Sequence, residues 1–94
     1  MLGDLFNKAK RYSEAIAIAR KGLEVDPLNA GSYCVWGKAL EKMERYEEAI
    51  DRFQKAVNCH DPNWTPYAKK EIERQQRLIE IRELKKQQEE LEEE

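Results

Sequence analysis

The chain repeats part of its own sequence at a spacing of 34 residues. The segment RYSEAIAIARKGL, residues 11–23, returns in similar form as RYEEAIDRFQKAV, residues 45–57. At this spacing the identical pairs include Gly3 with Gly37, Tyr12 with Tyr46, Glu14 with Glu48, Ala15 with Ala49, and Ile16 with Ile50. Repetition at a fixed period of this length indicates stacked supersecondary units, because one such unit cannot bury its apolar face alone.

The repeated segments have helical periodicity. Their apolar residues recur at spacings of three and four, which is typical of one face of a helix and not of a strand. These residues are Tyr12, Ala15, Ile16, Ala19 and Leu23, and then Tyr46, Ala49, Ile50, Phe53, Ala56 and Val57. The small residues Gly37, Ala49 and Ala56 are expected where two helix axes approach to roughly 8–10 Å.

Three segments separate the predicted helices. DPLNAG (residues 26–31) and HDPNWTP (residues 60–66) each contain proline, which cannot continue a helix interior, and a residue able to cap a helix start, Asn29 or Thr65. LEKMERY (residues 40–46) contains neither glycine nor proline. We therefore expect a tight turn at residues 43–45 between two antiparallel helices.

The second repeat resembles the tetratricopeptide repeat, a helix-turn-helix module of 34 residues. The residues that carry the resemblance are Trp36, Gly37, Leu40, Tyr46, Ala49, Phe53, Ala56 and the pair Asp61-Pro62. The resemblance implies an all-α superhelical array of antiparallel helix-turn-helix repeats, with about two units in residues 1–63. Two departures stand out: the first unit begins partway through its first helix, and Cys59-His60 adds one residue before Asp61. The first departure indicates a fragment of a longer array, with a natural short protein as the alternative.

Residues 64–94 are predicted to form a long C-terminal capping helix with an acidic tail. From Pro66 onward the sequence has no helix breaker, and Ala68, Ile72 and Ile79 lie on one face suited to packing on the second unit. Residues 83–94 contain six Glu and two Lys, so the tail carries a charge of −4.

The apolar face of this last helix changes side beyond Ile79. Three apolar residues of the distal half lie nearly opposite the packing face, which predicts that they meet another chain; a solvated, frayed tail is the alternative. The incomplete first unit also leaves apolar residues near the N-terminus that another copy could cover, by head-to-tail assembly or by exchange of helices. The candidate assembly surface therefore consists of Leu2, Leu5, Phe6, Ile81, Leu84 and Leu91.

Stacked helix pairs leave a concave surface lined by the first helix of each pair. By the resemblance, this groove binds a peptide segment or helix of a protein partner; the alternative is that its residues are merely solvent-facing. The predicted groove residues are Asp4, Asn7, Lys8, Gly31, Cys34, Val35, Lys38, Glu41 and Lys42. The apolar Cys34 and Val35 between lysines suit a ligand with a hydrophobic anchor and acidic residues. They do not match the Lys, Asn and Arg set with which one subclass of the family clamps chaperone C-termini.

Composition disfavours several other classes of function. The net charge of −2 argues against strong attraction to phosphates, although RNA binding stays the alternative function because some helical-repeat proteins bind RNA along their concave surface. With one histidine, His60, and no glycine-rich phosphate loop, the chain is predicted to be non-enzymatic and to need no cofactor.

The remaining features point to a cytoplasmic protein without metal. No apolar run reaches the roughly 18–20 residues of a membrane helix, and the N-terminus lacks the apolar centre of a secretory signal. Cys34 and Cys59 are too few for a disulfide framework and are expected to stay reduced, with a bridge between them as the lesser alternative. The ligand types in NCHD, residues 58–61, lack the spacing of a zinc site. The chain is thus predicted to be a protein-interaction scaffold.

Overall fold

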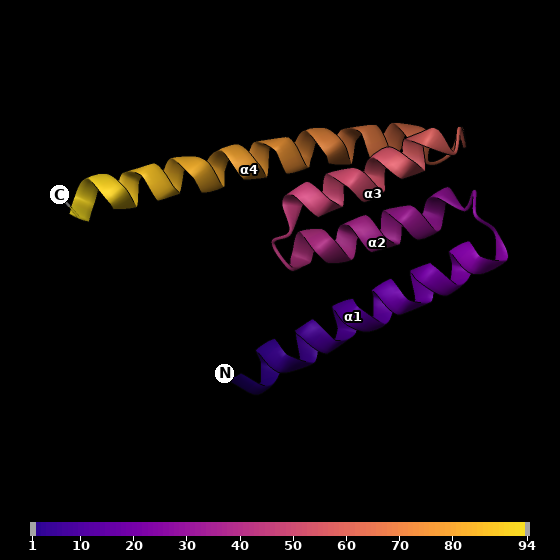
Figure 1. Cartoon of the computed structure of the whole chain (residues 1–94), viewed down its shortest axis with the longest axis horizontal. Coiled ribbons are helices and arrows are strands. Elements are labelled where there is room, and N and C mark those ends of the chain that lie inside the picture. Colours follow the sequence, from indigo (N-terminus) through magenta and orange to yellow (C-terminus); the bar gives the residue numbers. More distant parts are fainter. Residues whose placement is uncertain (1, 94) are drawn as a thin grey trace.

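The structure is a computed structural model that describes the backbone of residues 2–93 and the side chains of residues 8–93. It contains the helices α1 (Leu2–Val25), α2 (Ala30–Lys42), α3 (Tyr46–Asn58) and α4 (Thr65–Glu93), and no strand within residues 2–93 (Figure 1). The predicted all-α repeat fold is confirmed. Within the same residues, no helix combines the length and the apolar character needed to cross a bilayer.

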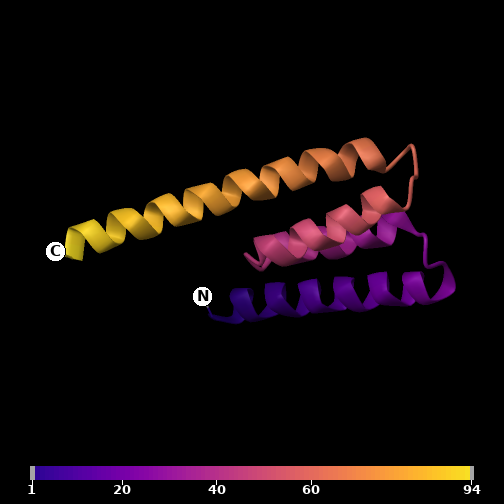
Figure 2. The same ribbon diagram turned by 45° about the horizontal axis from the view of Figure 1, so that its top comes forward.

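Consecutive helices run antiparallel and pack side by side (Figures 1 and 2). Each helix contacts the next one along the chain, and α2 also touches α4, whereas α1 and α4 have no contact within residues 2–93. The body is flat, with dimensions of 53 × 31 × 15 Å, and its longest dimension follows α4, which extends far past the ends of α2 and α3. A layer this thin leaves the helix faces open on one or both sides.

Small residues build most of the core, as predicted. Ala49, Ala56 and Ala68 are fully buried, and Phe53 is the largest apolar side chain that is completely buried. Gly37 of α2 lies against the Phe53 ring, where an added Cβ would stand 2.8 Å from the nearest ring atom. The absence of a side chain at Gly37 therefore allows α2 and α3 to approach closely around the aromatic ring.

The α2–α3 turn is as tight as predicted. Glu44 adopts the left-handed conformation with φ of 62°. Its N–H donates to the Glu41 carbonyl, and the Arg45 N–H donates to the Leu40 carbonyl, both at 2.9 Å. These two bonds satisfy carbonyl groups at the end of α2 and reverse the chain without glycine.

The two predicted capping residues behave differently. Asn29 caps α2, since the Ser32 N–H donates to Asn29 Oδ1 at 3.1 Å. Thr65 does not cap α4: it is the first helical residue, and its hydroxyl donates to the Asp61 carbonyl at 2.7 Å. The extra residue before Asp61 is accommodated by His60, which takes a left-handed φ of 56°.

The N-terminal part of α1 differs from the expectation of a separate first helix. At the 34-residue spacing, residues 9–11 correspond to the turn at residues 43–45, yet α1 is one continuous helix from Leu2 to Val25. Lys8, Ala9, Lys10 and Arg11 all favour a helix interior, and no glycine, proline or cap interrupts them. Residues 2–10 therefore extend α1 instead of folding back beside it.

The proximal half of α4 packs on α3, whereas its distal half is exposed. Ala68 is completely buried and Ile72 packs against the core, as predicted, but the polar Glu71 and Gln75 are buried as well. All residues from 80 to 93 are exposed. The exposed fractions of the apolar residues in this half are 49% for Ile81, 64% for Leu84 and 71% for Leu91.

Candidate partner-binding groove

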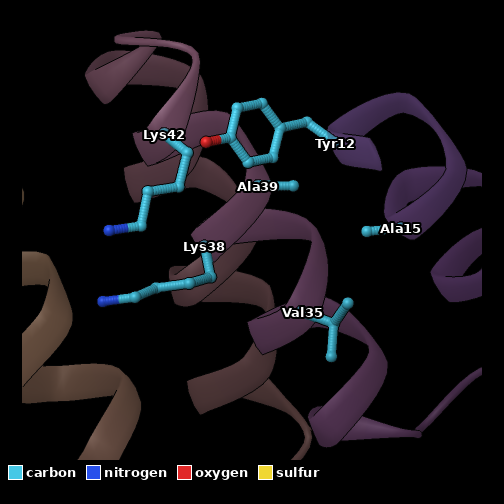
Figure 3. A pocket seen from close by; sticks show the side chains of 6 residues that line it. All are labelled: Tyr12, Ala15, Val35, Lys38, Ala39 and Lys42. Carbon is cyan, nitrogen blue, oxygen red and sulfur yellow. The ribbon is translucent and has the colours of Figure 1, made fainter. Parts of the chain in front are cut away.

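An open groove of about 280 Å³ lies on the surface between the packed helices α1 and α2. Figure 3 shows Tyr12 pointing from α1 toward α2 beside Ala39, while the amino groups of Lys38 and Lys42 extend away from α1. The residues that line the groove are Tyr12, Ala15, Val35, Lys38, Ala39 and Lys42. A second hollow adjoins it at Tyr12 and Lys42 and adds Lys8, Ala9 and Met43. The surface thus combines an apolar floor with lysines on its rim.

The groove is open because, within residues 2–93, no helix lies on α1 in the way that α2 lies on α3. In the second repeat, α2 packs on α3 and Ala49 is completely buried. Its counterpart in the first repeat, Ala15, is only partly buried and lines the groove. Since residues 2–10 continue α1, none of the four helices described covers on α1 the position that α2 covers on α3.

The rim lysines differ in how far their charge is compensated. Lys38 Nζ lies 3.4 Å from Glu71 Oε2 and 3.5 Å from Glu41 Oε2. Lys42 Nζ is 4.0 Å from Glu41 Oε2, and half of the Lys42 side chain is exposed. Lys42, together with the exposed Lys8, therefore presents the positive charge that an incoming ligand meets first.

A buried polar cluster beside the groove joins α2 to α4. The Glu41 carboxylate accepts a hydrogen bond of 2.5 Å from Gln75 Nε2, and Arg74 Nε lies 3.2 Å from Glu41 Oε1. Burial by itself raises the pKa of Glu41, but the Gln75 hydrogen bond and the charges of Lys38, Arg74 and Lys42 outweigh it, so the pKa is lowered. The carboxylate stays ionised and holds α4 against α2.

The structure corrects part of the predicted groove. Val35, Lys38 and Lys42 line the α1–α2 groove, and Lys8 lies in its continuation. Cys34 and Glu41 were expected to face the groove, but they are 2% and 6% exposed. The reason is that α4 crosses this face of α2: Cys34 shares the buried cluster with Ala68, and Glu41 bonds to Gln75.

Other predicted residues are also covered or fall outside the described part. Gly31 is half-buried and lies under the Trp64 ring, which an added Cβ would meet at 3.1 Å. Several predicted residues have side chains outside the described residues, namely Asp4 and Asn7 of the groove and Leu2, Leu5 and Phe6 of the assembly surface.

Sequence reasoning missed the floor of the groove. Tyr12 and Ala15 belong to the apolar stripe that was expected to pack inside the array, and Ala39 has no distinctive pattern. The signal that could have identified them was the run of helix-favouring residues 8–11, because a helix that continues through this run does not fold back over the Ala15 face.

The cysteines are free thiols and do not form the alternative disulfide. Burial, with smaller contributions from the nearby Glu71 and Cys59, raises the pKa of Cys34 to about 11. Burial also raises the pKa of Cys59, whose thiol donates to the Lys55 carbonyl at 3.3 Å. In the part of the chain that the structure describes, no three potential metal ligands of the types His, Cys, Asp and Glu form a group suited to an ion.

Comparison with known proteins identifies the repeats. The family model described as "Tetratricopeptide repeat" matches residues 1–27 and 30–58, and the chain belongs to this family. Its curated relatives include the proteins named "Cell division cycle protein 16 homolog" from Homo sapiens and Mus musculus, each 36% identical over 56 residues. The matched segment makes up 60% of this chain but 9% of each relative, so the chain spans a small part of their length. These matches support a protein–protein interaction scaffold.

Proposed function

We propose that this chain binds a helix or extended segment of a protein partner in the groove between α1 and α2. Apolar side chains of the partner would contact Tyr12, Ala15 and Val35, and its acidic side chains would approach Lys42 and Lys8. The observation that carries the proposal is the partial exposure of Ala15 in the groove, whereas the corresponding Ala49 is covered by a helix.

The shape of the groove favours a polypeptide segment over a small molecule. It is shallow and open along the helices, whereas small-molecule sites are deeper pockets of about 300–1,000 Å³ that enclose most of the ligand. In the second repeat the corresponding position on α3 is filled by α2, so a helix is an occupant that this packing geometry already accommodates. An amphipathic helix would contact the groove with residues spaced at three and four.

Charge favours protein over RNA as the ligand. RNA binding requires basic residues that follow the phosphate backbone. Glu41 and Glu71 lie beside Lys38, so the positive charge is interrupted in the middle of the groove. A partner with a few acidic residues needs only local contacts to Lys42 and Lys8. With free thiols on the chain, we place this interaction in the cytoplasm.

Defined peptides test the proposal. We would measure by fluorescence anisotropy the binding of a helical peptide with two leucines seven residues apart on a glutamate-rich background, and of the same peptide with lysines replacing the glutamates. The glutamate-rich peptide is expected to bind more tightly. Val35→Glu should abolish this binding, because it places a charge on the apolar floor beside the acidic ligand.

A matched variant controls for nonspecific effects. Ile18 is 69% exposed on α1 and does not line the groove, so Ile18→Glu is expected to bind the glutamate-rich peptide like the parent. Circular dichroism would verify that both variants keep their helices. Equal binding by Val35→Glu and the parent, or tighter binding of the lysine-rich peptide, would contradict the proposal.

A further inference from the structure

The distal half of α4 leaves the body of the molecule. Arg82 makes two hydrogen bonds to the Glu47 carboxylate on α3, at 2.9 and 2.8 Å, and every residue from 83 to 93 beyond it is exposed. Ile81 borders a hollow between α3 and α4 that Tyr46 and Leu78 also line, so it stays close to its own domain. Leu84 and Leu91 do not line this hollow and are 64% and 71% exposed. We define residues 83–93 as the α4 overhang.

The overhang matches the groove in spacing. Leu84 and Leu91 are seven residues apart, which places them on the same side of the helix and about 10.5 Å apart along it. The groove extends along α2 from Val35 to Lys42, which is also seven residues. Two leucines of the overhang therefore span the same length as the groove.

The overhang also matches the groove in charge. Residues 83–94 contain six Glu and two Lys and carry −4, whereas exposed Lys8 and Lys42 lie along the groove. Pairing of two overhangs with each other would bring together two acidic segments, and 11 residues are fewer than the three to four heptads that sustain a coiled coil. The groove is thus the better partner for the overhang.

A chain cannot place its own overhang in its own groove. The two helices α1 and α4 lie on opposite sides of the α2–α3 pair and have no contact within residues 2–93 (Figures 1 and 2). The overhang continues α4 as one unbroken helix to Glu93, directed away from the body. The helix that fits the groove must therefore come from another molecule.

We propose that the groove between α1 and α2 binds the α4 overhang of a second copy of this chain. Leu84 and Leu91 of one copy would lie over Ala15, Val35 and Ala39 of the other, with the glutamates of the overhang near Lys42 and Lys8. The inference rests on the proposed function, because it identifies the partner of the same groove.

Complementation between two variants tests this arrangement. Val35→Glu damages the groove and leaves the overhang intact, whereas the double variant Leu84→Gln, Leu91→Gln damages the overhang without changing its charge. By sedimentation velocity, the parent is expected to self-associate as its concentration rises. For each variant alone, the dissociation constant for self-association should be at least about tenfold higher than for the parent. An equimolar mixture should form a complex, since it contains one intact groove and one intact overhang.

Three results would overturn the inference. The first is a parent chain that stays monomeric up to millimolar concentration. The second is unimpaired self-association of Val35→Glu, which would indicate pairing between overhangs. The third is a mixture that forms no complex although circular dichroism shows both variants folded. If the parent is monomeric but the glutamate-rich peptide still binds in a Val35-dependent manner, the proposed function stands and only the second copy as partner is refuted.

Discussion

Replacing the buried Glu41 with alanine is expected to destabilise the chain, and replacing Gln75 with leucine as well is expected to restore most of the loss. The Gln75 side chain is completely buried, its Nε2 donates to Glu41, and its Oε1 has no hydrogen-bond partner. Alanine at position 41 would leave the whole Gln75 amide unpaired between α2 and α4.

The magnitudes follow from these contacts. An orphaned buried amide costs about 1–3 kcal/mol, and a hydrogen bond to a charged group contributes about 1.5–3 kcal/mol. Arg74 and Lys42 are half exposed, so water replaces much of what they lose when Glu41 is removed. We therefore expect Glu41→Ala to cost about 2–3 kcal/mol, out of roughly 5–14 kcal/mol for a domain of this size.

The second substitution removes both a favourable and an unfavourable contribution. Gln75→Leu eliminates the unpartnered Oε1 and the hydrogen bond to Glu41, and these effects are similar in size. We expect the free energy of unfolding of Gln75→Leu to lie within about 1 kcal/mol of that of the parent. The double variant Glu41→Ala, Gln75→Leu should be close to the parent as well, because replacing both polar partners with apolar groups leaves no buried polar group unpaired.

Urea denaturation of the four proteins, followed by circular dichroism, gives the coupling between the two positions. The expected coupling free energy is about 1.5–3 kcal/mol. If the changes in the free energy of unfolding of the two single variants add up to that of the double variant within about 0.5 kcal/mol, the reasoning is refuted. Such additivity would show that Glu41 and Gln75 do not depend on each other. Glu47→Ala serves as the control: its ion pair with Arg82 is exposed, so little change is expected.

Three further predictions concern single residues. The pKa of Glu41 is lowered in the folded state, so its stabilisation is fully present above the ordinary value of 4.5 and is lost as pH falls through the folded pKa. Urea titrations below about pH 5 should therefore show that the free energy of unfolding falls more steeply with decreasing pH for the parent than for Glu41→Ala. Gly37→Ala should lower the free energy of unfolding by about 1–3 kcal/mol in the same assay, because its Cβ would stand 2.8 Å from the Phe53 ring; an unchanged midpoint would show that the ring moves at no cost. In a Cys59→Ser background, iodoacetamide at about pH 8 should label Cys34 roughly a hundredfold more slowly in the folded than in the urea-unfolded chain, since burial raises its pKa to about 11; equal rates would contradict the burial.

Features that depend on neighbouring residues in the chain were predictable. The helical stripes, the proline-containing breaks and the Asn29 cap each act within a few residues, and the structure agrees with all three. The tight turn at Glu44 was also predictable, because the stretch between the two helices contains neither glycine nor proline.

Features that depend on which helix covers which face were not predictable. Cys34 and Glu41 have the sequence positions of groove residues, yet α4 buries them. Tyr12 has the position of a core residue, yet it borders an open groove because α1 continues through residues 9–11, which correspond to the turn at residues 43–45. In each case the local sequence pattern is the same whether the residue is buried or exposed. The pattern alone therefore could not distinguish the two environments.

The sequence by itself determined that this chain is an all-α repeat protein with a long acidic C-terminal helix, because helical periodicity, breakers and caps act locally. Only the tertiary structure decided which surfaces are available. Burial depends on where each helix crosses its neighbours, and a face such as that of Ala15 stays open when the helix that would cover it runs elsewhere. The same crossing of α4 over α2 that buries Glu41 leaves Val35 and Lys42 exposed beside the groove.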